Sequence, residues 1–265
     1  MNGEQLRAAM HNGETVFGTM TSIIRNPRWA GVYGRLGLDY VIVDTEHSPT
    51  GRTEAADLAV AFMGVGICPI IRVPNTDPYQ TIMALDAGFH GVLVPYCETA
   101  DEVRQVVEAA RQRPLKGGLH YKARDSGVYP SEASQKYLAE RNKNVVVIIG
   151  IESVPAMEQL DKILDVPGID AIFIGPNDLS ITLGIPDEYN NPRFIEAAEH
   201  IITTSQARGI PAGGHWQVED QIDFWMGKGS RFVLYSSDAR ALTEGYRSAL
   251  NKFRGSAVNQ MQHTL

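Results

Sequence analysis

Two carboxylates that follow successive strand-like runs, Glu152 and Asp178, have the chemistry of a divalent-cation site. Glu152 lies at the end of VVVIIGIES, Asp178 lies at the end of AIFIGPND, and one predicted helix separates the two runs. Because the carboxyl ends of parallel strands open on one face of an α/β fold, we expect both side chains on that face, where ligands bind. Carboxylate oxygens without a Cys/His cluster favour Mg2+ or Mn2+ over structural zinc, with Co2+ as an alternative.

The segment YVIVDTEHSP places a possible acid–base group directly after another strand. Asp44 and His47 are close enough in sequence for the carboxylate to orient the imidazole, which is the arrangement that a general base needs. In the alternative interpretation, Asp44 caps the next turn and His47 is an ordinary loop histidine.

Arg72 ends the strand-like run CPIIRVPN. A guanidinium in a barrel mouth is costly unless it meets an anion, so we expect it to bind a substrate carboxylate or an enolate oxygen. The alternative is a structural ion pair with Asp44, Glu46 or Glu152, and the two roles can coexist.

Two more segments have groups that could contact a substrate. The turn GPND begins a helix, so its backbone N–H groups could hold a carboxylate. His215 and Trp216 follow the run IPAGG and either roof the site or simply pack. The resulting substrate-binding candidates from the turn are Gly175, Pro176, Asn177 and Asp178.

The order of apolar strands and amphipathic helices predicts the fold class. Eight short Val/Ile-rich runs alternate with eight helix-like stretches, which favours an α/β protein with a (β/α)8 TIM barrel. A doubly wound open sheet gives the same alternation and remains the alternative. We expect one barrel domain over residues 1–255 and a frayed tail over 256–265. The expected strands are 15–21, 40–46, 68–74, 91–96, 145–153, 171–178, 210–216 and 231–237.

Composition limits the class of protein further. The chain has 265 residues, a net charge of -7 and 43% hydrophobic residues, with no apolar run near the roughly 20 residues of a spanning helix. Scattered basic residues argue against nucleic acid, and the absence of a signal peptide pattern argues for the cytoplasm. Cys68 and Cys97 are expected to be free thiols, and Cys97 to be structural.

The motifs VDTEHSP, IIRVP, LDAGFHGVLVPYCETADEV, IGIES and FIGPNDLSITLGIP together resemble the HpcH/HpaI family of class II pyruvate aldolases. The resemblance runs from about residue 15 to residue 253. It implies a barrel whose last helix is exchanged between subunits, and a homo-oligomer, either a trimer or a hexamer. It also implies that Glu152 and Asp178 bind the metal, that His47 with Asp44 acts as base, and that Arg72 stabilises an enolate.

Three departures from the family pattern surround the expected substrate. Gly150 stands where several members have Gln, which removes a donor and would open space. The long segment 116–144 differs from the family's loop, although Arg124 could bind the aldehyde half. His215 and Trp216 replace a small or apolar cap.

The resemblance implies reversible cleavage of a 4-hydroxy-2-oxo acid to pyruvate and an aldehyde through a metal-stabilised pyruvate enolate. No lysine stands at a recognisable Schiff-base position, which disfavours a class I mechanism. Oxaloacetate decarboxylation, as in macrophomate synthase, is the alternative that uses the same enolate. A citryl- or malyl-CoA lyase is disfavoured because this chain has no evident basic site for CoA. A barrel that has lost catalysis and only binds or assembles is disfavoured because every polar group that the chemistry needs is present.

Overall fold

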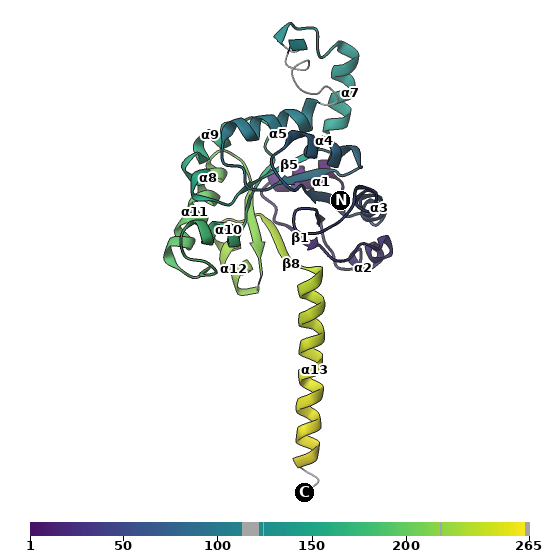
Figure 1. Cartoon of the computed structure of the whole chain (residues 1–265), viewed down its shortest axis with the longest axis vertical. Helices are drawn as coiled ribbons and strands as arrows, with labels where there is room; N and C mark the ends of the chain where they lie inside the picture. The colour runs from purple at the N-terminus through teal and green to yellow at the C-terminus, as the bar shows by residue number, and fades with distance from the viewer. Residues whose placement is uncertain (113–121, 124, 218, 263–265) are drawn as a thin grey trace.

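Eight parallel strands form a closed barrel in the computed structural model, which describes residues 1–112, 122–123, 125–217 and 219–262 (Figure 1). Each strand pairs with the next, and β8 pairs with β1. The closed barrel is therefore confirmed over the open sheet. The strands are β1 (Val16–Thr21), β2 (Tyr40–Asp44), β3 (Cys68–Arg72), β4 (Gly91–Val94), β5 (Val146–Ile151), β6 (Ala171–Ile174), β7 (Ala212–Trp216) and β8 (Phe232–Ser237).

Helices alternate with the strands and cover the outside of the barrel. After β1, a short 3-10 turn is followed by one helical turn, and after β5 the helical segment divides at Gln159. The helices are α1 (Gly3–His11), η1 (Pro27–Trp29), α2 (Ala30–Tyr33), α3 (Arg52–Gly64), α4 (Pro78–Asp86), α5 (Ala100–Gln112), α7 (Glu132–Asn142), α8 (Val154–Glu158), α9 (Leu160–Leu164), α10 (Pro176–Thr182), α11 (Pro192–Ala207), α12 (Glu219–Gly227) and α13 (Asp238–Gln262).

Helix α1 closes the amino-terminal end of the barrel and was not predicted. Its Leu6 and Met10 are buried in the same cluster as the inward-facing strand residues. The spacing of Asn2 and Gln5 forms a capping box, which is a sequence feature that could have revealed the helix. The N–H of Gly3 donates to Nδ1 of His90, so His90 lies at the bottom of the barrel, away from the carboxyl ends of the strands.

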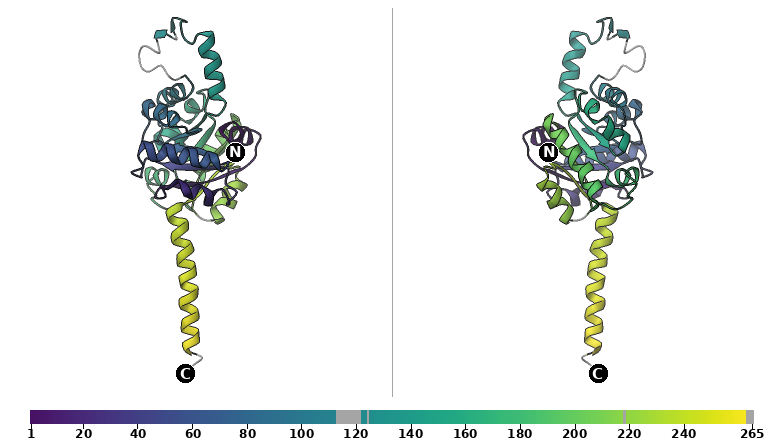
Figure 2. Two further views of the ribbon diagram at one scale, coloured as in Figure 1. Left: turned by 90° about the vertical axis from the view of Figure 1, so that its right-hand side faces the viewer. Right: turned by 90° about the vertical axis from the view of Figure 1, so that its left-hand side faces the viewer.

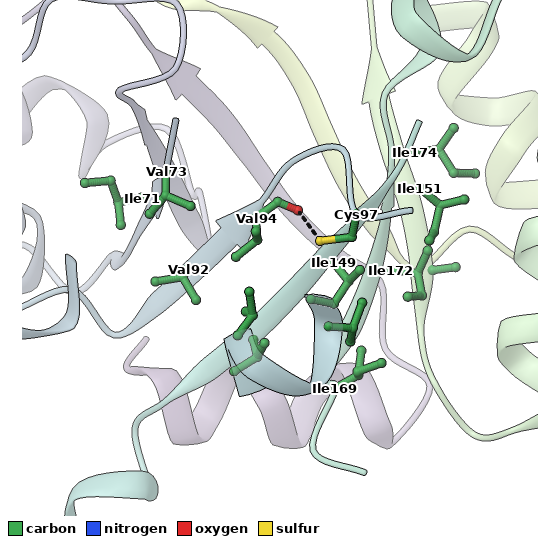
Figure 3. Packing of buried hydrophobic residues seen from close by; sticks show 14 of the residues in the cluster. Ile71, Val73, Val92, Val94, Cys97, Ile149, Ile151, Ile169, Ile172 and Ile174 are labelled. Atoms are coloured by element: carbon green, nitrogen blue, oxygen red, sulfur yellow. Dashed lines mark hydrogen bonds between the residues drawn. The ribbon is translucent and has the colours of Figure 1, made fainter. Parts of the chain in front are cut away.

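The strands are buried on both faces, because side chains fill the barrel and helices cover it. Inside, the rings of Tyr40 and Phe232 stack with centroids 4.6 Å apart. Outside, β-branched side chains of neighbouring strands pack under the helices, as Figure 3 shows around Ile149 and Ile172. Cys97 lies in this layer with its thiol near the carbonyl oxygen of Val94, so its structural role is confirmed.

Helix α13 departs from the usual barrel, because it projects away from the body of the protein instead of returning along it (Figures 1 and 2). It begins directly after β8 and continues past residue 255, so the residues expected to form a frayed tail are helical as far as Gln262. Even this helix, the longest one described, lacks an apolar stretch that could cross a membrane.

Candidate active site

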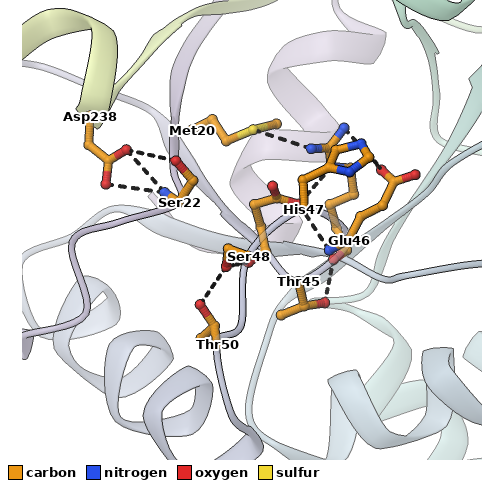
Figure 4. A network of polar contacts seen from close by, with 10 residues as sticks. Met20, Ser22, Thr45, Glu46, His47, Ser48, Thr50 and Asp238 are labelled. Carbon is orange, nitrogen blue, oxygen red and sulfur yellow. Dashed lines mark hydrogen bonds and ion pairs between the residues drawn. The ribbon is translucent and has the colours of Figure 1, made fainter.

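The carboxyl ends of β2 and β3 hold a buried ion pair. Asp44 and Arg72 stand opposite each other in the strand register, and Nε of Arg72 donates to Oδ1 of Asp44 at 2.8 Å. A second nitrogen, Nη1, lies 3.1 Å from Oε2 of Glu46. Figure 4 shows Glu46 beside His47 at this corner of the barrel. The ion-pair interpretation of Arg72 is thus confirmed for Asp44 and Glu46. Two anchored nitrogens fix the plane of the guanidinium at the barrel mouth.

The expected pairing of Asp44 with His47 is wrong in this structure. Oδ1 of Asp44 accepts from Arg72 and from the backbone N–H of Glu46, whereas Nε2 of His47 lies 3.6 Å from Oε2 of Glu46. The reason is local: Asp44 still belongs to β2 and faces β3, but the chain turns after Thr45, whose hydroxyl donates to the carbonyl oxygen of Arg72. The side chain of His47 is 67% exposed at the mouth.

Glu46, expected only as a possible ion-pair partner of Arg72, is also the carboxylate beside His47 in the site. Burial raises its pKa, the charges of Arg72 and His47 oppose the rise, and Asp44 and Asp178 add to it. Glu46 therefore interacts with charges from both the β2–β3 corner and the α10 turn. In the sequence, the feature that could have indicated this role is the second carboxylate of the segment DTEH, two positions after Asp44.

Glu152 is buried at the end of β5, only 3% exposed. Burial, followed by the charge of Glu46, raises the pKa of Glu152 to about 8, although Arg72 opposes the rise. The carboxyl group lies against Gly175, where an added Cβ would be 2.7 Å from Cδ of Glu152. A glycine at this position therefore lets the acid occupy the mouth.

The expectation that Gly150 opens space is corrected. A Cβ on Gly150 would lie 3.0 Å from Oε1 of Glu152 and 3.0 Å from Cα of Pro95. The carboxyl group of Glu152 and the chain after β4 therefore already lie in close contact with the position that a Cβ would take. Gly150 therefore permits this placement of Glu152.

Asp178 lies in the first turn of α10, half-buried, two residues after the buried Pro176. Its negative charge raises the pKa of both Glu46 and Glu152, so the α10 turn faces the same mouth. Among the described residues, no three His, Cys, Asp or Glu side chains are arranged as a complete metal-binding group. Two carboxylates and free coordination positions suit a hard cation that keeps water or a chelating ligand.

His215 and Trp216, at the end of β7, have different surroundings. Trp216 is buried and stacks on Trp225 with ring centroids 5.0 Å apart, which confirms the packing alternative for this residue. His215 is largely buried, with Nε2 at 2.9 Å from the carbonyl oxygen of Ser236. Burial lowers the pKa of His215 to about 4, so its imidazole is neutral near pH 7.

The remaining predicted residues lie at the edge of the site or beyond the described chain. Gly175 caps α10, and Asn177 is exposed with Oδ1 within hydrogen-bond distance of the hydroxyl of Tyr189. Arg124 lies outside the described residues. Helix α7 occupies the second half of the segment 116–144, and its Arg141 pairs with Asp86 at 2.7 Å.

Comparison with known proteins gives a consistent picture. The family model for HpcH/HpaI aldolase/citrate lyase matches residues 22–244. A 5-keto-4-deoxy-D-glucarate aldolase from Salmonella arizonae is 30% identical over 236 residues, which cover 88% of this chain and 90% of that protein.

Solved structures agree with this match. An HpcH/HpaI aldolase from Desulfitobacterium hafniense superposes with a TM-score of 0.83 at 27% identity, covering 94% of this chain and 96% of that chain. Citrate synthase SbnG gives 0.82 at 26% identity, covering 95% and 98%. Macrophomate synthase gives 0.80 at 27% identity, covering 97% and 91%.

A closed barrel with ionisable side chains gathered at the carboxyl ends of its strands defines the protein as a TIM-barrel enzyme. The extent of the match then defines the family. This chain belongs to the HpcH/HpaI aldolase/citrate lyase family, and it is a carbon–carbon lyase.

Proposed function

We propose that this protein is a metal-dependent class II aldolase that reversibly cleaves a 4-hydroxy-2-oxo acid to pyruvate and an aldehyde. The observation that carries the proposal is the position of Arg72, which is anchored by Asp44 and Glu46 beside the acidic pair Glu152 and Asp178. Breaking the C3–C4 bond leaves an electron pair on the pyruvate fragment, and a fixed cationic donor stabilises that charge.

Glu152 and Asp178 would hold a divalent cation, Mg2+ or Mn2+. Glu152 is buried near two other carboxylates, an arrangement that bound positive charge would stabilise. A cation there supplies a Lewis acid for the carboxylate and ketone oxygens of the 2-oxo acid.

Arg72 positions the substrate and compensates its developing charge. Because Asp44 and Glu46 hold two of its nitrogens, the guanidinium needs little reorganisation when the ketone oxygen becomes an enolate oxygen. The backbone of the α10 turn, residues 175–178, binds the substrate carboxylate.

His47 accepts the proton of the C4 hydroxyl, directly or through one water. Its imidazole is exposed at the mouth, and Glu46 rather than Asp44 is the carboxylate beside it at 3.6 Å. A nearby carboxylate stabilises the imidazolium that forms when the proton arrives. In the reverse direction, His47 returns the proton to the new alkoxide.

The assembly in this proposal is a homo-oligomer, a trimer or a hexamer, in which α13 packs on a neighbouring subunit. Leu242, Tyr246, Leu250 and Phe253 form an exposed apolar face on α13. A groove of about 400 Å³, lined mainly by apolar residues of the β1–α2 region, lies open beside its first turn. An exposed apolar face on a helix and an open apolar groove on the same chain are the two surfaces that an exchange of α13 between copies would bring together.

The test is pyruvate release from a panel of 4-hydroxy-2-oxo acids and oxaloacetate, with Mg2+ or Mn2+ and with EDTA. The proposal predicts metal-dependent pyruvate from at least one hydroxy-oxo acid and its loss in Glu152→Gln. Glu158→Gln, in α8 on the barrel exterior, is the matched control. Pyruvate from no hydroxy-oxo acid would refute the proposal.

Oxaloacetate decarboxylation is the second candidate, because macrophomate synthase shares the whole fold at 27% identity. The same Arg72 would stabilise the charge that remains when carbon dioxide leaves. Pyruvate from oxaloacetate alone in the same panel would favour this function over the aldolase.

A further inference from the structure

The first turn of α10, which bears Asp178, begins without a side-chain cap. Its N-cap residue is Gly175, whereas helices α8 and α11 begin with the capping side chains of Ser153 and Asn191. Glycine is needed here, because a Cβ on Gly175 would lie 2.7 Å from Cδ of Glu152. The residue that admits Glu152 to the mouth therefore lacks the side chain that would ordinarily fix the start of the helix.

The loop after α10 holds this turn from outside. The hydroxyl of Tyr189 lies within hydrogen-bond distance of Oδ1 of Asn177, the residue before Asp178, and 2.9 Å from Oδ1 of Asp187. A phenol has one proton to donate. Both contacts are satisfied when the phenol donates to the carboxylate of Asp187 and the amide of Asn177 turns its nitrogen to donate to the phenol oxygen.

A second path through the backbone closes the same network. The buried hydroxyl of Ser180 donates to the carbonyl oxygen of Asn177 at 2.7 Å and accepts from the N–H of Asp187 at 3.1 Å. Asp187 has a φ of +61°, a left-handed conformation that aspartate tolerates better than most residues. One short loop therefore holds Asn177 at both its side chain and its carbonyl group.

The ring of Tyr189 is fixed by packing. It meets the buried ring of Phe194, in α11, edge to face with centroids 5.6 Å apart. Burial, then the hydrogen bond and charge of Asp187, and then the charge of Asp178 raise the pKa of Tyr189 to about 12. The hydroxyl therefore stays protonated near pH 7, has a defined position, and lies within electrostatic reach of Asp178.

Packing alone fixes only part of the α10 turn. Pro176 and Leu179 are buried, whereas Asn177 is exposed and Asp178 is half-buried. The helix has only seven residues, too few to be stable through its own hydrogen bonds. The network around Tyr189 therefore restrains the part of the turn that the core does not hold.

We propose that Tyr189 is a positioning residue that, through Asn177, holds Asp178 where it can share a divalent cation with Glu152. This inference rests on the metal site of the proposed function. Tyr189 contacts neither the cation nor the substrate in this role. Its hydroxyl keeps the α10 turn in the conformation that the cation needs, so that less reorganisation accompanies binding.

The experiment measures the affinity for Mn2+ alone, by titration against the EPR signal of the free ion, without substrate or turnover. Tyr189→Phe removes the hydroxyl and keeps the ring packing, Asn177→Ala removes its partner, and a double variant combines the two changes. Tyr137→Phe, which removes a tyrosine hydroxyl that contacts Arg141 on α7, is the matched control. Thermal melting of each metal-free variant reports damage to the fold separately.

Tyr189→Phe is expected to weaken Mn2+ binding about tenfold, and Asn177→Ala by a similar factor. Because both changes break one link, the double variant should bind no more weakly than either single variant. The control should bind as the wild type does.

Two results would overturn the role of Tyr189 alone. The first is an unchanged Mn2+ affinity in Tyr189→Phe while Glu152→Gln abolishes binding, even if the melting temperature falls. The second is a pair of losses that multiply in the double variant, since the two residues would then act separately. Absence of Mn2+ binding by the wild type would overturn the proposed metal site and this assignment together.

Discussion

Nε of Arg72 lies 2.8 Å from Oδ1 of Asp44, and the two residues stand opposite each other in the register of β2 and β3. This pairing makes Asp44 the group that positions the guanidinium, instead of the group that orients His47. Because the side chains of Asp44 and Arg72 are 2% and 12% exposed, the pair is hardly screened by water.

Asp44→Asn should therefore damage the protein more than most single changes at a barrel mouth. It leaves a buried guanidinium with one carboxylate partner, which costs about 3 kcal/mol of unfolding free energy. Urea denaturation of the variant and of Asp86→Asn, an exposed ion-pair partner of Arg141, checks this. Equal midpoints for the two variants would show that the Asp44–Arg72 pair contributes little.

Much of the fold and part of the site could be predicted from the sequence, for physical reasons that differ by residue. Barrel strands are buried on both faces, so their Val/Ile-rich runs, and the polar residues at their ends, can be recognised from the sequence alone. Glu152 and Arg72 were found in this way. The direction of the chain after a strand cannot be recognised in the sequence. For this reason Asp44 was paired with His47, and Glu46 was expected only as an ion-pair partner of Arg72.

Gly150 illustrates a second limit of the sequence. A missing side chain suggests open space, but only the folded chain shows that Glu152 and Pro95 lie in close contact with that position. The course of α13 is a third case. Its amphipathic sequence predicts a helix, whereas its direction depends on contacts that the sequence does not reveal.

The stability of the protein should fall as the pH drops from about 6.5 towards about 4, because of His215. Burial lowers the pKa of His215 to about 4, whereas an unfolded histidine titrates near 6.5. Between these two pKa values the unfolded chain binds the proton and the native state does not. The free energy of unfolding therefore falls by up to about 3 kcal/mol across this window. Chemical denaturation of wild type and His215→Asn at several pH values measures the difference. The same pH dependence in both would contradict this origin.

Asp238 should be important for holding the start of α13. Its carboxylate accepts from the backbone N–H groups of Ser22, Ile23 and Ile24, the last at 2.7 Å, and from the hydroxyl of Thr21 at 3.0 Å. Asp238→Asn replaces an acceptor by a donor, which should cost about 2–3 kcal/mol of unfolding free energy. Thermal melting beside Glu244→Gln, an exposed partner of Arg240, is the measurement.

The same carboxylate gives a second, acidic component to the pH dependence. Burial alone would raise the pKa of Asp238, but its backbone N–H donors outweigh burial and lower it. Its stabilisation is therefore present above the unfolded pKa of about 3.9 and is lost as the pH falls through the lower native pKa. An unchanged acid transition in Asp238→Asn would refute this contribution.

Substitutions on the apolar face of α13 should break the oligomer. Phe253 is 69% exposed on the single chain, and a charge at this position would be buried against a neighbour. Phe253→Asp should shift the mass measured by light scattering towards the monomer, and Leu36→Asp in the groove should do the same. Asn251→Asp, an exposed α13 residue outside this apolar face, is the control. A monomeric wild type, or an oligomer unaffected by both changes, would contradict helix exchange.

The most direct test of the central claim is the exchange of the methyl protons of pyruvate for deuterium, followed by NMR in D2O. It reports enolate formation at Arg72 and the acidic pair without any assumption about the aldehyde. The account predicts exchange that requires Mg2+ or Mn2+, stops with EDTA, and is lost in Glu152→Gln and Arg72→Lys but not in Glu158→Gln. Metal-independent exchange, or exchange that survives both site variants, would contradict the account.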